Sequence, residues 1–136
     1  MKKGLLILSV LFFLSSCDVW LVEVPYDPRD NFIGRFTVEE YSETYDVLTK
    51  YKVRIVKDGD AYSNAVYISN FYGEDLEILG EVVGDRLIIP HQSINGYVIE
   101  GTGRIEYGDL VMTYSVDDYY DNNGLVDFCN TVYFRR

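Results

Sequence analysis

Apolar and polar residues alternate with a period of two along most of this chain, and no other feature restricts its fold as strongly. The alternation runs through residues 32–38, 51–55, 66–68, 76–82, 97–105 and 110–116, and two further β-rich segments lie at 87–89 and 126–134. A period of two places alternate side chains on opposite faces of a strand. No segment has a sustained apolar period of 3.6, so the sequence predicts eight strands, the fifth of them closed by Pro90.

Short segments rich in Gly, Asn and Asp separate the expected strands, at 57–60, 83–85, 107–109 and 122–124. Gly and Asn tolerate the positive φ angles of tight hairpins. Eight strands joined in this way indicate an antiparallel meander, either a barrel or a sandwich. We favour an all-β, eight-stranded antiparallel up-and-down β-barrel, because the strand order needs no long crossover and closure removes exposed edges.

The interior of an eight-stranded barrel can be filled by side chains or can hold one small ligand. Large side chains on the apolar faces either fill that space or line a cavity, and a sequence does not separate the two roles. The candidate ligand-binding residues are Phe36, Tyr51, Tyr97, Met112 and Tyr114. Gly101 and Gly103 share an apolar face, where glycine either bends the strand, the favoured interpretation, or leaves space inside.

The N-terminus has the three parts of a secretory signal. Lys2 and Lys3 precede an apolar run over residues 4–14, which is too short to span a bilayer comfortably, and Ser15, Ser16 and Cys17 follow. Residues 1–16 are therefore predicted to be a signal peptide. A plain secretory signal with a chance cysteine is the alternative.

The tetrapeptide at residues 14–17, Leu-Ser-Ser-Cys, resembles the bacterial lipobox. The resemblance implies cleavage before Cys17 and diacylation of this residue with chains such as palmitate, and more than one chain gives stable membrane attachment. Residues 17–30 are then the lipidated cysteine and a tether, and residues 31–136 are the folded domain. Asp18 is compatible with retention at the inner membrane or with export to the cell surface.

Several stretches of the domain, in this order, resemble the lipocalin-like (calycin-like) small lipoproteins of Gram-negative bacteria: residues 27–38, 68–72, 88–96, 101–105 and 112–116. The resemblance implies a β-barrel on a lipid anchor in the cell envelope, with the outer membrane, on its periplasmic face or at the cell surface, as the expected place. It implies no particular ligand.

Two details of the resemblance concern single residues. Gly34-Arg35-Phe36 is similar to the Gly-x-Trp motif that opens lipocalins, and Arg135 would be the arginine from the last strand that closes the barrel floor. Family members often pair a cysteine of the first strand with one of the last, but residues 39–42 contain none. If Cys17 carries lipid, Cys129 is expected to be a buried free thiol, with a disulfide between chains as the alternative.

The charge balance restricts the partners. The chain has 12 Lys and Arg against 22 Asp and Glu, for a net charge of −10, and loss of Lys2 and Lys3 with the signal would make it more negative. Nucleic acids and anionic bilayer surfaces both select positive proteins. The predicted membrane contact is therefore the lipid anchor alone, and nucleic acid is not an expected partner.

The sequence contains no recognisable catalytic set, so neither an enzyme nor a cofactor is predicted. The single histidine, His91, follows Pro90 in an expected polar loop, and Ser93 lies in no Gly-x-Ser-x-Gly motif. Asp117, Asp118 and Asp121 form a weak cation candidate, but the spacing departs from a calcium loop, and a solvated hairpin is the alternative.

Tyrosine is the most unusual component, with 13 copies. Five tyrosines fall on polar faces or in loops, where they either form a recognition surface or have no function: Tyr62, Tyr67, Tyr72, Tyr119 and Tyr120. We expect a lipid-anchored binding module that takes a small apolar or aromatic ligand in the barrel lumen or mouth. The alternative is a structural lipoprotein with a solid barrel that contacts another envelope protein through its acidic, tyrosine-bearing surface.

Overall fold

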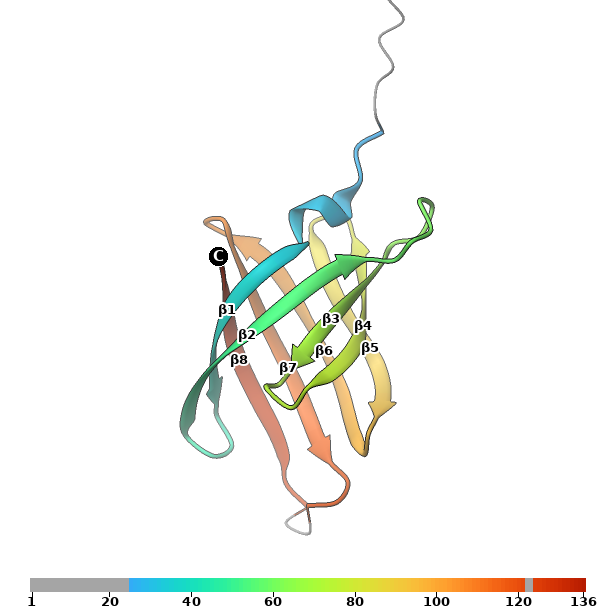
Figure 1. Cartoon of the computed structure of the whole chain (residues 1–136). Helices are drawn as coiled ribbons and strands as arrows, with labels where there is room; N and C mark the ends of the chain where they lie inside the picture. The colour runs from blue at the N-terminus through green and yellow to red at the C-terminus, as the bar shows by residue number, and fades with distance from the viewer. Residues whose placement is uncertain (1–24, 122–123) are drawn as a thin grey trace, which may run out of the picture.

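The computed structural model describes residues 25–121 and 124–136, and its strands form one closed barrel (Figure 1). Each strand pairs antiparallel with the next along the chain, and the last pairs with the first. The predicted eight-stranded antiparallel up-and-down barrel is thereby confirmed. The strands are β1 (Gly34–Ser42), β2 (Val47–Lys57), β3 (Ala65–Phe71), β4 (Leu76–Val83), β5 (Arg86–Ile94), β6 (Tyr97–Glu106), β7 (Asp109–Asp118) and β8 (Val126–Arg135).

The expected signal peptide, Cys17 and most of the tether lie outside the described residues. Within the described ranges, no helix has the length and apolarity needed to cross a membrane.

The period-two alternation becomes an inward and an outward face of the barrel wall. The inward apolar side chains form one core, in which Phe36, Ile68, Leu87 and Met112 have no exposed surface. Burial of this apolar set is the main force that stabilises the fold.

The inward glycines do not leave empty space inside. A Cβ atom at Gly101 would lie 2.4 Å from the Cβ of Tyr114, and one at Gly103 would lie 2.6 Å from the Cγ of Met112. The missing side chains on β6 therefore let side chains of β7 cover that strand closely.

One end of the barrel is closed by the segment that precedes β1. Residues Pro28–Asn31 form the short 3₁₀ helix η1, which Asp27 caps, and Phe32 behind it is fully buried. On the outer side, Lys57 Nζ lies 2.7 Å from a carboxylate oxygen of Asp30. Part of the predicted tether is thus docked on the barrel, ahead of the expected domain boundary at residue 31.

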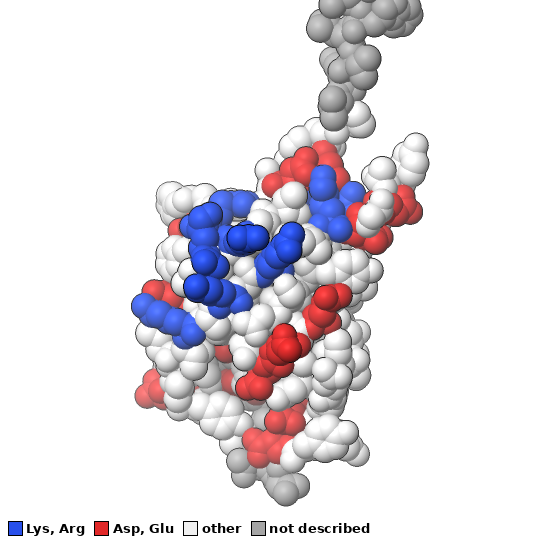
Figure 2. All heavy atoms as spheres, in the orientation of Figure 1, with Lys and Arg blue, Asp and Glu red and all other residues white. Residues whose placement is uncertain are grey.

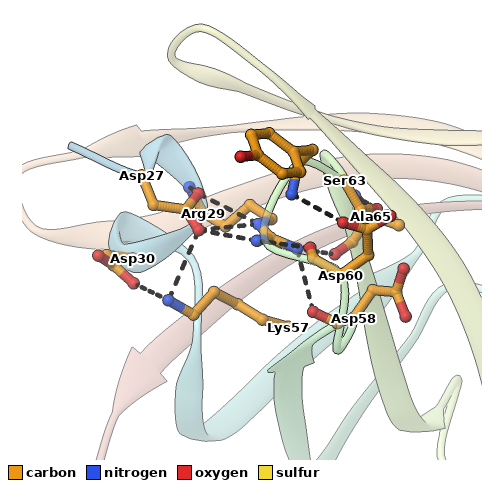
Figure 3. Close-up of polar contacts among 9 residues, drawn as sticks. Asp27, Arg29, Asp30, Lys57, Asp58, Asp60, Ser63 and Ala65 are labelled. Atoms are coloured by element: carbon orange, nitrogen blue, oxygen red, sulfur yellow. Dashed lines mark hydrogen bonds and ion pairs between the residues drawn. The ribbon is translucent and has the colours of Figure 1, made fainter. Parts of the chain in front are cut away.

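Arg29 attaches η1 to the turn between β2 and β3 (Figure 3). Its side chain is 3% exposed, and its Nε and Nη2 donate to the carboxylate of Asp27 at 2.8–3.1 Å. The same guanidinium donates to the backbone oxygens of Asp58, Asp60 and Ala65 at 3.2–3.3 Å. The hydrogen bonds from Arg29 lower the pKa of Asp27 to about 2. A planar guanidinium can serve all of these acceptors at once.

Arg135 of β8 lies at this closed end, as the family resemblance implied. Its guanidinium carbon is 5.1 Å from the centre of the Phe36 ring, and its Nη1 donates to the backbone oxygen of Ile33 at 2.8 Å. Nη2 donates to the backbone oxygen of Asn31. The arginine therefore joins the last strand to the segment that closes the barrel.

The prediction that Pro90 closes the fifth strand is wrong. β5 continues to Ile94, and its register with β6 shifts between Ile89 and Gln92. Proline lacks a backbone N–H and is tolerated at such an irregularity. His91 consequently lies in a strand rather than a loop, with its side chain 70% exposed and its Nδ1 3.6 Å from a Glu100 oxygen.

The outer surface separates its charges (Figure 2). Basic side chains gather on the outward faces of β1 and β2, whereas red acidic atoms dominate the lower part of this view. The pairing register places Arg35 opposite Arg54, with Lys52 and Lys50 further along β2. The protein therefore has one basic face although its net charge is strongly negative.

Candidate functional site

A pocket of about 420 Å³ opens at the end of the barrel opposite η1, the lower end in Figure 1. Its wall comes from the inward faces of β1 and β2, the turn after β3 and the beginning of β8. The lining includes Glu40, Ser42, Thr49, Tyr51, Tyr72 and Asp127. We call it the mouth pocket.

Polar residues reach this pocket because the inward alternation continues after the apolar residues end. On β1, Glu40 and Ser42 follow Phe36 and Val38 on the inward face, and all four are buried. On β8, Asp127 starts the inward series that ends at Tyr133. The barrel interior is thus apolar near η1 and polar at the mouth.

Two buried carboxylates form the centre of the mouth pocket, since Glu40 and Asp127 are each 4% exposed. The hydroxyl of Tyr51 donates to Glu40 Oε2 and lies 3.1 Å from the hydroxyl of Tyr114. Asp127 accepts hydrogen bonds from Ser42 Oγ on one oxygen and from the Tyr72 hydroxyl on the other. Hydroxyl donors from two strands and one turn therefore converge on the two acids.

The surroundings oppose ionisation of Glu40. Burial raises its pKa to about 7, the hydrogen bond from Tyr51 works against that rise, and the nearby charge of Asp127 adds to it. Burial also raises the pKa values of the Tyr51 and Tyr72 hydroxyls and of the Cys129 thiol. The phenols are therefore neutral hydrogen-bond donors at physiological pH, and Cys129 is a protonated thiol.

No basic side chain of residues 25–121 and 124–136 forms an ion pair with either buried acid. Lys50, at the edge of the pocket, pairs instead with Glu39 on the outer face at 3.0 Å. Deeper inside, the fully buried hydroxyl of Tyr133 has no hydrogen-bond partner in the described part of the chain. Burial, and after it the charges of Glu40 and Cys129, raise the pKa of this hydroxyl.

The five predicted ligand-binding residues occupy two levels of the barrel. Tyr51 lines the mouth pocket, Tyr114 adjoins it through the hydroxyl contact, and the Tyr97 ring meets the Tyr72 ring edge-on at 6.3 Å. Phe36 and Met112 are fully buried in the core and do not line this pocket. The structure therefore brings the three tyrosines to the mouth and leaves the other two in the packed interior.

The aspartates predicted as a weak cation site lie at the end of β7 and in the turn that follows it. Asp117 is exposed, and Asp118 accepts a hydrogen bond from the backbone N–H of Tyr120 at 3.0 Å. Asp121 follows in the turn, and residues 122–123 lie outside the described part. The described residues contain no group of three or more His, Cys, Asp or Glu side chains that could hold a metal ion.

Reasoning from the sequence singled out Tyr51 but missed Glu40 and gave Asp127 no site of its own. Tyr72 was considered only as a surface residue. The alternation itself could have identified the two acids. Glu40 lies an even number of residues from Phe36, and Asp127 an even number from Tyr133, so each acid shares the inward face of its strand.

Comparison with known proteins does not assign a family. No protein-family model matches the chain, and no curated protein matches it significantly. The closed eight-stranded antiparallel barrel is compatible with a lipocalin-like fold.

Proposed function

We propose that this protein is a lipid-anchored cell-envelope binding module, of the lipocalin-like lipoprotein type, that holds a small ligand in the mouth pocket. The observation that carries this proposal is the pocket itself, in which two buried carboxylates without a basic partner in the described chain face solvent-accessible space. Binding sites combine apolar or aromatic walls with placed polar groups. This pocket sets Tyr45, Val47, Tyr51 and Tyr72 beside charged and hydroxyl-bearing side chains.

The pocket dimensions suit a small molecule. A volume of about 420 Å³ lies within the usual range for small-molecule sites. Tyr45, Tyr51 and Tyr72 supply aromatic surface at the wall, where an apolar or aromatic ligand body would pack. The remainder of the barrel interior is occupied by the core, so the ligand sits in the mouth rather than in a deep lumen.

The anchor and the mouth would lie at opposite ends of the domain. The described chain begins beside η1 at the closed end. With the chain cleaved before Cys17 and Cys17 diacylated, this end faces the membrane and the mouth faces away from it. This arrangement supports an outer-membrane lipoprotein that captures its ligand from the adjoining aqueous space.

The phenols and the thiol of the pocket support binding rather than nucleophilic catalysis. Burial raises the pKa values of the Tyr51, Tyr72 and Cys129 side chains, so none of the three is an activated nucleophile at neutral pH.

Native mass spectrometry of the full chain, purified from its own envelope in a mild neutral detergent, tests the proposal. We expect a mass excess that disappears on denaturation. Thr49→Trp, on the exposed mouth wall, should fill the pocket and abolish the excess. Thr113→Trp, on the exposed outer face of β7, is the matched control and should retain it.

Two outcomes would contradict the proposal. One is a bare mass that stays bare after exposure to envelope extract. The other is a bound molecule that both tryptophan variants retain equally, since it would then lie outside the mouth.

The alternative function, contact with another envelope protein, draws on the exposed aromatic residues. Tyr119 and Tyr120 are 81% and 75% exposed in the turn beside the mouth, and Tyr62 is fully exposed in the turn near η1. Exposed tyrosines are efficient recognition residues. Replacement of Tyr119 and Tyr120 by serine separates the two functions, because it should weaken a protein contact and leave a ligand in the mouth pocket unaffected.

A further inference from the structure

We propose that the mouth pocket selects a small organic cation whose protonated amine lies between Glu40 and Asp127 and whose body packs against the surrounding tyrosines. This inference rests on the proposed function, since it assigns a charge to the ligand of the same pocket. It also refines the expectation from the sequence, which predicted an apolar or aromatic ligand and assigned it no charge.

The first support is the missing counter-charge. Asp and Glu are rarely as buried as these two unless a cation accompanies them, because desolvation of a carboxylate is costly. In the described chain, Glu40 and Asp127 accept hydrogen bonds from hydroxyls, and Asp127 also from the Cys129 thiol, all of them neutral donors. An ammonium group would supply both the charge and N–H donors for the remaining lone pairs.

The second support is a further polar need beneath the pocket, the unsatisfied hydroxyl of Tyr133. This group is fully buried and has no partner among the described residues, and burial first and the charge of Glu40 next raise its pKa. Buried polar groups almost always have a hydrogen-bond partner, so a polar atom from outside the described chain is expected beside it. Because Tyr133 does not line the mouth pocket, an internal water molecule would provide that atom and would connect the interior to the acidic centre.

The third support is the aromatic wall. Tyr45, Tyr51 and Tyr72 all line the pocket, and Tyr97 packs against Tyr72. Tyrosine rings attract cations through their faces and pack against apolar groups. The same side chains would be unremarkable around a neutral ligand, but beside two carboxylates they favour an amine that has an apolar body.

The charges around the mouth add a long-range attraction. Glu74 lines the pocket, and Asp118 and Asp121 lie close enough to Tyr45 to raise its pKa. A cleft lined by one sign of charge concentrates ligands of the opposite sign and raises their association rate. Lys50 reaches the edge of the pocket but pairs with Glu39 on the outer face, so acids dominate the interior of the mouth.

An organic cation fits this donor set better than a metal ion. The described residues offer no group of three or more metal-ligating acids, histidines or cysteines. Ca²⁺ and Mg²⁺ take six or more ligands, most of them oxygen atoms. A single ammonium group is satisfied by two carboxylates and a few hydroxyls.

The site should respond to pH through Glu40. Groups that face this acid are the phenols of Tyr51, Tyr72 and Tyr133, the thiol of Cys129 and the carboxylate of Asp127. Glu40 itself has its pKa raised to about 7, whereas burial keeps the phenols and the thiol neutral. A cation prefers the ionised acid, so affinity should fall as the pH decreases from 8 to 6.

Isothermal titration of the full chain in neutral detergent with three matched probes tests the inference: benzylamine, benzyl alcohol and benzoate. These molecules share one ring and differ in charge. We expect benzylamine to bind at least about tenfold more tightly than benzyl alcohol, because hydrogen bonds between charged groups are stronger than those of a neutral hydroxyl. Benzoate should not bind. The affinity for benzylamine should fall between pH 8 and pH 6, where the amine itself remains protonated.

Isosteric variants place the effect on the two acids. Glu40→Gln and Asp127→Asn should each lower the affinity for benzylamine about tenfold. Glu40→Gln should also remove the dependence of that affinity on pH. Glu39→Gln is the matched control, because it changes the neighbouring residue on the outward face of β1. Thermal unfolding of each variant checks that the barrel is intact.

The outcomes separate the charge of the ligand from the existence of the site. If benzyl alcohol or benzoate binds as tightly as benzylamine, and Thr49→Trp abolishes that binding, the pocket is a binding site but the inference that its ligand is a cation is overturned. If benzylamine binds equally to the Glu40, Asp127 and Glu39 variants, the assignment to the two acids is overturned. Absence of binding by all three probes at millimolar concentration would contradict the cation inference, while native mass spectrometry still judges the proposed function independently.

Discussion

At the scale of single residues, Glu40 makes the stability of the empty barrel depend on pH. In the unfolded chain this acid ionises near its ordinary pKa of 4.5, whereas in the barrel burial raises the pKa to about 7. The folded state therefore binds more protons between these values, and the free energy of unfolding falls as the pH rises from about 5 to 8. The shift corresponds to a loss of about 3 kcal/mol.

Urea unfolding at pH 5 and pH 8 checks this prediction. Glu40→Gln removes the titration, so its loss of stability between the two pH values should be smaller than in the parent by about 3 kcal/mol. Glu39→Gln, with its exposed side chain on the opposite face, should retain the full loss. Equal losses in the parent and in Glu40→Gln would show that Glu40 does not carry the effect.

The candidate site could be predicted only in part, because the alternation of apolar residues identifies faces and not the ends of strands. Tyr51, Tyr97 and Tyr114 were found because aromatic residues mark the inward face. Glu40 received no role because the alternation in the first segment was followed only to Val38. The extra length of the barrel wall makes this acid an interior residue, and that length depends on pairing with β8, far along the chain.

At the scale of elements, the seam between β4 and β5 depends on one side chain. Backbone pairing there covers only three residue pairs, from Glu81 opposite Ile88 to Val83 opposite Arg86. Beyond them, the Gln92 amide takes the place of a strand, since it accepts from Leu79 N at 2.9 Å and donates to Leu79 O at 2.8 Å. Both backbone groups of Leu79 are satisfied in this way.

Gln92→Ala should therefore destabilise the barrel by about 1–3 kcal/mol, the cost of leaving polar groups without partners. Hydrogen exchange should accelerate at the Leu79 amide, because that N–H loses its acceptor. Ser93→Ala, which changes the next and exposed residue, should cost less than about 0.5 kcal/mol. If the exchange rate of Leu79 is unchanged in Gln92→Ala, the amide does not hold this seam.

The same seam shows why the prediction for the fifth strand failed. Proline usually ends a central strand because it removes a ladder hydrogen bond. Here Pro90 lies where the register with β6 shifts, and the Gln92 side chain supplies bonds to β4 on the other side. The lost proline hydrogen bond is thus compensated by a side chain that bonds to β4 and by a register shift against β6. Neither feature can be deduced from local sequence.

At the scale of the whole molecule, strand number and order were predictable because eight alternating segments with short turns have few arrangements. The closing contact between β1 and β8, which separates a barrel from a sandwich, joins distant parts of the chain and was favoured only on general grounds. The net charge was a poorer guide, since it averages an acidic mouth with a basic wall on β1 and β2.

The seam between β1 and β8 offers a direct test of barrel closure. Ser42 and Cys129 are register partners across it, and both are buried. The adjoining pair is bonded, with Glu43 N donating to Phe128 O at 2.8 Å. Ser42 and Cys129 consequently form a non-hydrogen-bonded pair, in which Cα atoms approach to about 4.5 Å. That separation suits a disulfide.

Ser42→Cys should therefore form a disulfide with Cys129 under mild oxidation. Because the bond would close a long loop, it should stabilise the oxidised protein over its reduced form by about 2–4 kcal/mol. Urea unfolding with and without reductant measures this difference, and mass spectrometry of the peptides identifies the bond. Ser42→Ala, which also loses the hydrogen bonds to Asp127 and Tyr45, should show no response to reductant. Free thiols at both positions after oxidation would mean that β1 and β8 do not meet in this register, and the mouth pocket, whose two acids these strands carry, would then lose its structural basis.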